Sequence, residues 1–430
     1  MRRVAFYTLG CKVNQYETEA MRELFTGVGD TIVDSETVAD IYVINTCTVT
    51  GMSDKKSRQF IRRCRRLNPE ALIAVVGCYS QIAPAEVMAI EGVNLVLGTS
   101  QRNRIVELLD DMTSDDRREQ VTDIMKIREF EEMTVDTIES RTRAFIKIQD
   151  GCDRYCSYCI IPYARGPVRS RASENVLAEV ERLASKGFRE VVLTGIHVAS
   201  YGKDCETETL IGLLTGINKT PGLERIRLSS LEPVLLTEPF MHELAKNKKI
   251  CPHFHISLQS GCDSVLKRMN RRYTADEYLE IVHRVRAYYP LAAITTDIIA
   301  GFPGETEEEF EATMKFVERV GFSQIHVFGF SPREGTPAAT MPDPIRPEIR
   351  QQRVEQLMKL GARLEEQYMK LFIGKTMRVL VEKNESGGIA EGLTENYLRV
   401  LLPKGDYEPG TEIDVVVIAL ESGALRAMVV

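Results

Sequence analysis

The sequence predicts a multidomain α/β protein with a doubly wound N-terminal domain, a central partial (β/α)6 barrel and a small C-terminal antiparallel β-barrel. A chain of 430 residues is too long for one ordinary hydrophobic core. Apolar strand patterns alternate with helical patterns along most of the chain, which is typical of parallel sheets covered by helices. Short strands separated by glycines follow. We therefore expect domains at 1–98, 140–370 and 373–430, with a helical linker at 99–139.

The N-terminal segment places three cysteines directly after buried strands. Strands are expected at 4–9, 41–45, 71–76 and 93–97, with helices at 14–28, at 53–67 and after Pro84. Cys11, Cys47 and Cys78 follow the first three of these strands. Because the carboxyl ends of parallel strands lie along one edge of a sheet, we expect these thiols to converge. The alternative is three buried cysteines that only happen to end strands. Cys64 lies inside a predicted helix.

That helix, between Lys55 and Arg66, is rich in lysine and arginine and contains no acid. A charge run of this kind is usually a solvated face. The helix begins just after Cys47, at the edge of the sheet where the three thiols are expected to converge. The alternative is therefore that the helix meets phosphate groups or neutralises an anionic cluster and its substrate.

The central segment begins with a strand at 144–149 followed by Cys152, Cys156 and Cys159. These three thiols are soft metal ligands, and no fourth Cys or His lies nearby. A structural zinc site requires four protein ligands, whereas a 4Fe-4S cluster can be bound by three cysteines, which leaves one iron open. The open iron–sulfur cluster is therefore the favoured interpretation. Zinc with a distant fourth cysteine and three ordinary loop cysteines are the alternatives.

Six strand–helix units fill the central segment and predict an incomplete barrel whose active edge is formed by the carboxyl ends of its strands. Ser229, Gln259 and Asp297 lie at or near these ends and suit cofactor binding. His253, His255 and His326, like Cys205, Cys251 and Cys262, are interpreted as structural. The strands are expected at 144–149, 190–194, 226–229, 254–258, 294–298 and 325–330, and the helices near 173–187, 207–217, 235–247, 262–269, 274–289 and 306–320. A charged helix from about 347 to 372 is expected to lead out of this segment.

The C-terminal strands are expected at 377–381, 397–402, 413–418 and 425–430, separated by glycine-rich turns. Small barrels of this kind often bind oligonucleotides. Residues 373–430 nevertheless contain nine acidic and six basic residues. RNA contact through this barrel would therefore depend on particular side chains.

Composition bounds the class of protein. The chain is 43% apolar and 27% charged, with a net charge of −7, so a nucleic-acid partner needs a local basic surface. No run approaches the roughly 18 apolar residues of a membrane span. The N-terminus does not resemble a secretory signal. We expect a cytoplasmic protein with reduced thiols and no membrane partner, acting as a monomer.

The Cys-x3-Cys-x2-Cys spacing resembles the radical-SAM superfamily, and nearly the whole chain resembles the methylthiotransferase family within it. That family has an N-terminal three-cysteine domain, a radical-SAM barrel and a C-terminal TRAM barrel. The motifs that carry the resemblance are Thr8-Leu-Gly-Cys-Lys-Val-Asn-Gln-Tyr-Glu17, Asn45-Thr-Cys-Thr-Val49, Gly77-Cys-Tyr79, Asp150-Gly-Cys152, Ile160-Ile-Pro-Tyr-Ala-Arg-Gly166 and Arg169-Ser-Arg171. Together with Leu193-Thr-Gly-Ile-His-Val-Ala-Ser-Tyr-Gly202, the first motif looks like the branch that acts on threonylcarbamoyladenosine.

The resemblance implies a reaction and a set of cofactors. Cys152, Cys156 and Cys159 would hold the 4Fe-4S cluster that cleaves S-adenosylmethionine (SAM), and Cys11, Cys47 and Cys78 an auxiliary 4Fe-4S cluster that carries sulfur. Tyr158, Ser229, Gln259 and Asp297 would lie near SAM. The implied reaction adds a methylthio group to carbon 2 of N6-threonylcarbamoyladenosine at position 37 of tRNA. One SAM would supply the methyl group and a second the radical.

The implied partners are the anticodon stem-loop of tRNA, an electron donor such as flavodoxin or ferredoxin, and a sulfur donor. The alternatives are a sibling enzyme that acts on isopentenyladenosine in tRNA or on a ribosomal protein, and a non-catalytic iron–sulfur protein that binds RNA.

Overall fold

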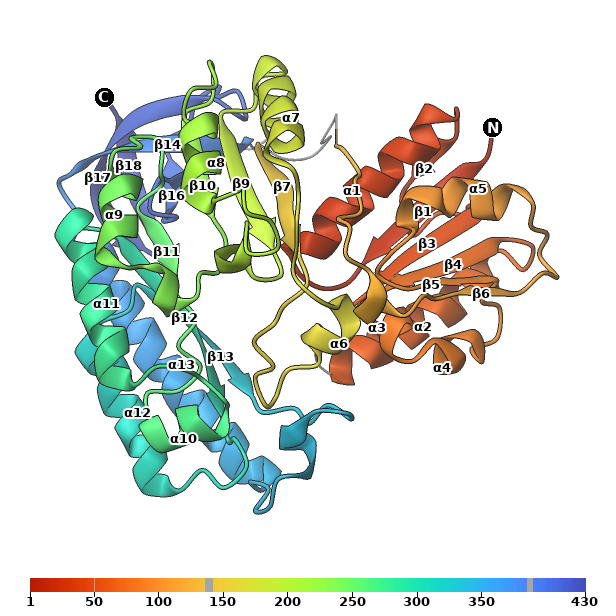
Figure 1. The fold of residues 1–430 in the computed structure, drawn as a ribbon. Helices are drawn as coiled ribbons and strands as arrows, with labels where there is room; N and C mark the ends of the chain where they lie inside the picture. The colour runs from red at the N-terminus through yellow and green to blue at the C-terminus, as the bar shows by residue number, and fades with distance from the viewer. Residues whose placement is uncertain (50, 136–141, 385–389) are drawn as a thin grey trace.

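The computed structural model describes residues 1–49, 51–135, 142–384 and 390–430. It shows the three expected parts of the chain (Figure 1): an N-terminal sheet domain, a central domain of two neighbouring sheets, and a C-terminal barrel that packs on the central domain. Among the described residues no helix is both long enough and apolar enough to span a bilayer.

The N-terminal domain is a parallel sheet covered on both faces. Its strand order is β2-β1-β3-β4-β5-β6. The order in which strands are added therefore reverses between the neighbouring strands β1 and β3. Helices α1 and α5 pack on one face and α2 and α4 on the other, which gives two separate apolar layers. The strands are β1 (Arg3–Thr8), β2 (Thr31–Val33), β3 (Ile41–Thr46), β4 (Leu72–Gly77), β5 (Leu95–Leu97) and β6 (Arg118–Gln120); the helices are α1 (Lys12–Gly27), α2 (Gly51–Leu67), α3 (Cys78–Ile82), α4 (Pro84–Met88) and α5 (Ile105–Asp110).

The segment 99–139 is not a helical linker over its described part. It contains the short helices η1 (Arg102–Arg104) and η2 (Ile124–Lys126) together with α5, and it adds β6 to the edge of the N-terminal sheet. The expectation failed because the charged residues of β6 lie at a sheet edge, where neither face needs a continuous apolar pattern. The expected boundary between 139 and 140 lies outside the described residues.

The central domain contains the expected parallel strands in the expected order. Strands β7, β9 and β10 form one sheet and β11, β12 and β13 another, and an isolated parallel bridge between Ile226 and Ile250 joins the two. Short β8 adds to the outer edge of β7 in antiparallel orientation. The described strands are β7 (Arg143–Asp150), β8 (Arg169–Ser170), β9 (Glu190–Gly195), β10 (Arg225–Leu228), β11 (His253–His255), β12 (Ala293–Ala300) and β13 (Gln324–Gly329).

The helices of the central domain cover the outside of this open barrel. Thr274 and Thr306 begin α11 and α12 with capping boxes, in which the threonine hydroxyl and the glutamate three residues later satisfy each other's backbone N–H groups. The described helices are α6 (Ile161–Arg165), α7 (Ser173–Ser185), α8 (Leu210–Ile217), α9 (Glu238–Ala245), α10 (Asp263–Arg268), α11 (Ala275–Tyr288), α12 (Glu307–Val320), α13 (Pro347–Lys370), η3 (Val198–Ser200), η4 (Pro233–Leu235) and η5 (Pro337–Thr340).

The C-terminal domain is a closed barrel in the order β14-β15-β16-β18-β17. It is not wholly antiparallel, because β16 and β18 pair in parallel. Strand β15 was not expected, since its Gly392 resembles a turn residue; a Cβ there would lie 2.4 Å from Val379 Cγ1, so the glycine allows close approach inside a strand. The strands are β14 (Thr376–Asn384), β15 (Ala390–Thr394), β16 (Arg399–Leu402), β17 (Glu412–Glu421) and β18 (Ala424–Val429).

Candidate active site

The three strand-end cysteines meet at one edge of the N-terminal sheet. Cys11 caps α1 just after β1, Cys47 is the residue after β3, and Cys78 is the first residue of α3 directly after β4. Strands β1, β3 and β4 are neighbours in the sheet, so their carboxyl ends lie side by side. A Cβ placed on Gly10 would lie only 3.0 Å from Cys47 Cβ, which shows how closely the Cys11 and Cys47 loops approach.

The buried side chains of Asn14 and Asn45 hold the loops at this edge in place. The Asn14 side-chain amide donates to the Thr46 carbonyl oxygen over 2.9 Å and to the Leu9 carbonyl oxygen over 3.0 Å. The Asn45 amide in turn donates to the Asn14 carbonyl oxygen over 3.0 Å. Both asparagines are at most 1% exposed. These bonds hold the loops that carry Cys11 and Cys47 in a defined arrangement, because buried polar groups are costly to leave unpaired.

The thiols of this set interact electrostatically. Burial raises the pKa of Cys78 to about 12; the Arg165 guanidinium lowers it, whereas Cys47 and Cys11 raise it further. Burial also raises the pKa of Cys47, and Cys11 adds to that shift. Three thiols that disfavour one another's charge require a bound cation if all are to be thiolates, and metal binding releases their protons.

The second set lies in the loop that follows β7. Asp150 Oδ1 accepts the backbone N–H of Gly151 over 2.8 Å, and the Cys152 N–H donates to the Gly166 carbonyl oxygen over 3.0 Å. Farther along the loop, Tyr155 has a φ of 47°. Such a left-handed conformation of a bulky residue is strained and is found mainly at functional sites.

Glycine precedes the first cysteine of this loop for a steric reason. Gly151 has a φ of +75°, and a Cβ there would lie 1.8 Å from the Pro167 carbonyl oxygen. Gly10 and Gly77, which precede Cys11 and Cys78, also have positive φ, at +120° and +99°. The glycine–cysteine pairs therefore turn the chain sharply where a strand ends and present the next thiol at the sheet edge.

A guanidinium group is directed at the loop cysteines as well. Arg271 Nη1 lies 3.3 Å from Cys156 Sγ, and its Nη2 lies 3.1 Å from Glu232 Oε2. Burial raises the pKa of Cys152 to about 11 and that of Cys159 to about 12. The loop thus combines one buried and two partly buried thiols with a fixed positive charge.

These donor sets fit two clusters of thiolate-bound iron. Each set offers three cysteines, and an arginine N–H points at one sulfur of each, as expected around anionic cluster sulfur. Within 1–49, 51–135, 142–384 and 390–430, no three His, Cys, Asp or Glu side chains approach closely enough to hold one metal ion. The thiolates of a cubane bind different irons and so lie farther apart than the ligands of a single ion.

Arg165 joins the two domains at the Cys78 side of the site. Its Nε donates to Cys78 Sγ over 3.2 Å, and its Nη2 donates to Asn14 Oδ1 over 3.0 Å and to Glu17 Oε2 over 3.1 Å. Arg165 itself lies in α6 of the central domain and is fully buried. The domain interface is therefore anchored to the loop edge that carries the strand-end cysteines.

Lys147 completes this buried ionic cluster. Its Nζ lies 2.7 Å from Glu17 Oε1 and 2.6 Å from Asp150 Oδ2. Burial acts to raise the pKa of Glu17, but Arg102, Arg165 and Lys147 outweigh it and lower that pKa to about 2. The pKa of Asp150 is lowered in the same way, since Lys147 and Arg165 outweigh its burial. Both carboxylates are ionised at neutral pH.

A cavity of ≈ 270 Å³ opens beside the loop cysteines and is lined by both domains. Cys159 borders it from the central domain, and Val49, two residues after Cys47, borders it from the N-terminal domain. Tyr158, Gln259 and Asp297 also line it. Ser229 is not among its lining residues; it follows β10, and its hydroxyl is buried without a hydrogen-bond partner among the described residues.

Gln259 is held in an unusual conformation at this cavity. It has a φ of 74°, its N–H donates to the Asp297 carbonyl oxygen over 2.9 Å, and its own carbonyl oxygen accepts from the Ile299 N–H. A left-handed non-glycine residue costs roughly 1–2 kcal/mol, so the neighbouring strand must hold it in place. The side chain of Gln259 is thereby turned to the cavity that Asp297 also lines.

Lys12 of α1 lies near Tyr397, Arg227 and Arg143. Burial lowers the pKa of Lys12; Tyr397 raises it, and Arg227 and Arg143 lower it. The Arg227 guanidinium carbon lies 4.8 Å from the centroid of the Tyr397 ring. Two acids compensate the arginines: Glu190 pairs with Arg227 over 2.7 Å, and Glu382 pairs with Arg143 over 2.7 Å.

The histidines that the sequence assigned to structure lie in the same region. Burial lowers the pKa of His253 well below its ordinary value, and Arg227 and Lys12 lower it further. His255 Nδ1 lies 2.9 Å from Thr295 Oγ1, and its ring centroid is 5.8 Å from that of His326. Of the remaining cysteines, Cys64 and Cys251 are buried, and Cys205 and Cys262 are partly buried.

Sequence reasoning did not identify Arg165, Arg271, Glu17 and Lys147 as site residues. Glu17 and Arg165 do lie within motifs that carried the family resemblance, at the ends of the runs Thr8–Glu17 and Ile160–Gly166. Arg271 and Lys147 have no such signal. Their roles depend on tertiary contacts across more than 100 residues, as the pairs Arg271–Cys156 and Lys147–Glu17 show.

Comparison with known proteins agrees with this arrangement. The family model described as the radical SAM superfamily matches residues 146–317, and the one described as the uncharacterized protein family UPF0004 matches residues 3–98. The solved structure of the radical S-adenosylmethionine methyltransferase TsrM from Kitasatospora setae has a TM-score of 0.57 and 17% identity, and the alignment covers 79% of this chain and 77% of that chain. This likeness shows the fold.

Curated relatives are similar over almost the whole chain. The threonylcarbamoyladenosine tRNA methylthiotransferase MtaB of Bacillus subtilis (strain 168) is 43% identical over 93% of this chain and 90% of its own. The enzyme of the same name from Rickettsia prowazekii (strain Madrid E) is 36% identical over 100% of this chain and 98% of its own. A tRNA-2-methylthio-N(6)-dimethylallyladenosine synthase from Pelotomaculum thermopropionicum is 34% identical over 90% of this chain and 88% of its own. The chain therefore belongs to the radical-SAM tRNA methylthiotransferase family.

Proposed function

We propose that this protein replaces the C2–H bond of N6-threonylcarbamoyladenosine at position 37 of tRNA with a C2–S–CH3 group. The observation that carries the proposal is the shared cavity, in which Val49 of the N-terminal domain and Cys159 of the central domain line one space. A sulfur held by the Cys11 set and a radical generated at the Cys152 set would act on the same substrate atom only if the two sets share a site. The names and identities of the curated relatives support the substrate.

The cofactors are two 4Fe-4S clusters and SAM. Cys11, Cys47 and Cys78 would hold the auxiliary cluster, and Cys152, Cys156 and Cys159 would hold the radical-SAM cluster. When bound, they supply the sulfur atom, the methyl group and the electron-driven cleavage of SAM to the 5′-deoxyadenosyl radical.

The protein's own side chains position these groups. Tyr158, Gln259 and Asp297 face the cavity and would bind SAM. Arg271 keeps a positive charge beside Cys156, and Arg165 does the same beside Cys78, so both guanidinium groups stabilise anionic sulfur. The buried ionic cluster of Glu17, Lys147, Asp150 and Arg165 holds the two domains at a fixed separation.

The charge inside the barrel supports the threonylcarbamoyl substrate over the isopentenyl one. A threonylcarbamoyl group carries a carboxylate, whereas an isopentenyl group is apolar. Arg143 and Arg227 lie close enough to Lys12 to lower its pKa. Glu190 and Glu382 are the carboxylates near these bases. Arg227 pairs with Glu190 and Arg143 pairs with Glu382, so Lys12 is the one base of this group without an ion pair among the described residues; its charge suits a carboxylate better than a hydrocarbon group.

The partners follow from the same reaction. The anticodon stem-loop of tRNA presents the nucleoside, a low-potential donor such as flavodoxin or ferredoxin supplies electrons, and a separate donor replaces the transferred sulfur. The protein works as a monomer in the cytoplasm, where its thiols stay reduced.

Nucleoside analysis of bulk tRNA from a deletion strain tests the substrate. Loss of 2-methylthio-N6-threonylcarbamoyladenosine, restored by the wild-type gene, is the expected result. Loss of the methylthio-isopentenyl nucleoside, or of ribosomal-protein methylthiolation, would instead assign the sibling activity. Anaerobic reduction in the presence of SAM tests catalysis, because a non-catalytic RNA-binding protein would release no 5′-deoxyadenosine.

Cysteine variants test the division of labour between the clusters. Cys11→Ala should lower iron from about eight to about four per chain and abolish methylthio transfer while reductive SAM cleavage continues. Cys205→Ala is the matched control and should keep both iron and product, since Cys205 belongs to neither set. Product formation by Cys11→Ala with eight irons retained would contradict the assignment.

A further inference from the structure

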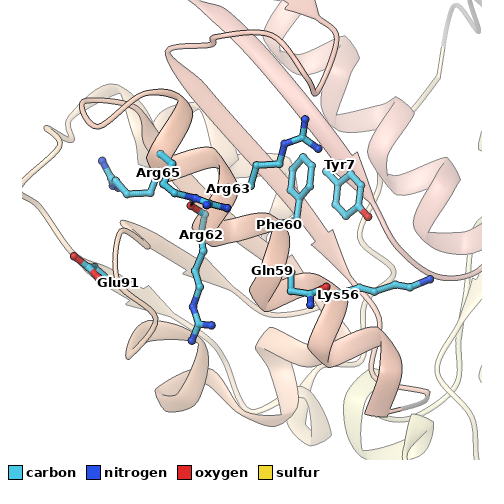
Figure 2. Close-up of a pocket in the computed structure, with 9 residues that line it drawn as sticks. Tyr7, Lys56, Gln59, Phe60, Arg62, Arg63, Arg65 and Glu91 are labelled. Atoms are coloured by element: carbon cyan, nitrogen blue, oxygen red, sulfur yellow. Dashed lines mark hydrogen bonds between the residues drawn. The ribbon is translucent and has the colours of Figure 1, made fainter.

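A groove of ≈ 950 Å³ lies along α2 on the surface of the N-terminal domain. We call it the basic groove and define it by Lys56, Arg62, Arg63 and Arg66 together with the aromatic pair Tyr7 and Phe60. Figure 2 shows the labelled side chains of α2 projecting around it, with the two aromatic rings face to face. None of these residues belongs to the cavity at the cysteines.

The charge of α2 is opposite to that of the chain as a whole. Seven lysine and arginine residues and no acid lie between Lys55 and Arg66, in a protein whose net charge is −7. The helical repeat brings most of them to the solvent side. The exposed residues of this stretch are Lys55, Lys56, Gln59, Arg62, Arg63 and Arg66.

Most of these bases form no ion pair among the described residues, and Glu91 is the acid that lines the groove with them. Within the described residues, Lys55, Lys56 and Arg62 form no ion pair, while Arg63 pairs with Glu36. Exposed bases on other helices behave differently. Lys246, Lys315 and Lys370 each pair with a glutamate three or four residues away on the same helix.

Packing does not explain the charge either. The apolar side of α2 is supplied by Phe60, Ile61 and Cys64, so the exposed positions are free to carry any polar residue. Like charges at i and i+4, such as Arg62 and Arg66, destabilise a helix by about 0.2–0.5 kcal/mol per pair. A polyanion that binds this face would remove that repulsion.

The direction of α2 relates the basic groove to the active site. The helix begins at Gly51, four residues after Cys47, and its Asp54 pairs with Arg333 of the central domain over 2.8 Å. From that end a helix of 17 residues extends about 25 Å. A chain of phosphates attached to a nucleoside in the cavity could follow the helix outward.

Tyr7 adds a second kind of contact, whereas Phe60 is buried and supports the Tyr7 ring from the apolar side of α2. The rings of Tyr7 and Phe60 stack with centroids 3.6 Å apart and planes 9° from parallel, and Tyr7 is only partly buried. Aromatic faces beside a basic track are typical of surfaces that bind single-stranded or looped nucleic acid.

From these observations we propose that the basic groove binds backbone phosphates of the substrate tRNA's anticodon arm. The proposal rests on the proposed function for the identity of the polyanion. The groove would place the arm and leave the choice of base to the cavity, because phosphate contacts position a nucleic acid without reading its sequence. It would also give an acidic protein the local basic surface that tRNA requires.

The test measures tRNA binding against salt concentration for the full-length protein with both clusters present. In the variant K56Q/R62Q/R66Q, all three side chains are exposed and none lies in the active site. The control K315Q/K359Q/K370Q removes the same charge from exposed positions on α12 and α13. The probe is tRNA that carries N6-threonylcarbamoyladenosine without a methylthio group, and its binding is followed by fluorescence anisotropy under anaerobic conditions.

We expect the groove variant to bind at least tenfold more weakly than the control at 0.1 M salt. The slope of log K against log salt should fall by about 2–3 for three lost phosphate contacts. Reductive SAM cleavage without tRNA should be unchanged, and KM for tRNA should rise far more than kcat falls. Equal affinity and equal slope in the two variants would overturn the proposal.

Two further outcomes are distinguishable. If the wild-type protein neither binds nor modifies this tRNA, the proposed function fails first. If the wild-type protein binds tRNA and the groove variant binds it equally well, but the groove variant alone loses retention on phosphatidylserine vesicles, the basic groove serves another anion and the proposal is wrong.

Discussion

Arg165 of the central domain lies with its Nε 3.2 Å from the Sγ of Cys78 in the N-terminal domain. The same guanidinium donates to Glu17 and Asn14, both of which are buried. One side chain therefore links the domain interface to a proposed cluster ligand. Breaking such a buried pair from one side leaves uncompensated charge and typically costs 3–5 kcal/mol.

Arg165→Met should accordingly lower the unfolding free energy by about 3–5 kcal/mol and reduce the iron bound by the Cys11 set. Urea unfolding and iron analysis measure the two effects. Arg399→Met is the matched control, because Arg399 pairs with Glu391 at the surface, where such a pair is worth about 1 kcal/mol at most. Equal destabilisation by the two variants would contradict the linking role of Arg165.

Arg271→Met should shift the reduction potential of the radical-SAM cluster to a more negative value. Arg271 Nη1 lies 3.3 Å from Cys156 Sγ, and loss of a positive hydrogen-bond donor disfavours the added electron. Outer-shell changes of this kind typically cost roughly 10–100-fold in activity. A redox titration followed by electron paramagnetic resonance measures the potential, and an unchanged potential would show that the contact has no electrostatic role.

Gly151→Ala should abolish the radical-SAM cluster, because the new Cβ would lie 1.8 Å from the Pro167 carbonyl oxygen. Gly187→Ala is the matched control: Gly187 also has a positive φ, of +94°, but nothing lies within 4 Å of an added Cβ. The control should keep all its iron and lose only about 1–2 kcal/mol of stability. Iron content and the rate of reductive SAM cleavage would separate a steric from a purely conformational effect.

Glu17 should make the domain interface sensitive to acid. Its pKa is lowered to about 2 from an ordinary 4.5, so its stabilising contribution is complete above about pH 4.5 and is lost as pH falls toward 2. In cluster-free protein, the stability difference between wild type and Glu17→Gln should shrink by roughly 3 kcal/mol across that range. Urea unfolding at several pH values measures it, and a constant difference from pH 7 to pH 3 would refute the expectation.

Asp297 and Ser229 were both expected to lie near SAM because both lie near strand ends, but they differ in their relation to the cavity. Asp297 lines the cavity, whereas Ser229 does not. Asp297→Asn should raise KM for SAM roughly tenfold, as expected for the loss of one charged hydrogen bond of about 1.5 kcal/mol. Ser229→Ala should leave KM unchanged. Formation of 5′-deoxyadenosine at varied SAM concentration tests both, and the reverse order of effects would move the SAM site away from the cavity.

The sequence by itself determined the order of elements and the places of the cysteines. Continuous apolar strands such as 71–76 specify buried parallel strands regardless of context, because both of their faces must be covered. A cysteine that follows such a strand is then confined to one edge of the sheet. Local patterns were insufficient for β6 and β15, whose charged or glycine-containing stretches pair only because a neighbouring strand is available.

Only the tertiary structure decided what surrounds the cysteines. Arg165, Arg271 and Lys147 act on residues far away in the sequence, so no local spacing reveals them. Tertiary packing likewise brings Val49 to the cavity of Cys159 and excludes Ser229 from it. A strand's own residues decide that it is buried, but the charges and spaces at its end depend on which other parts of the chain come to lie there.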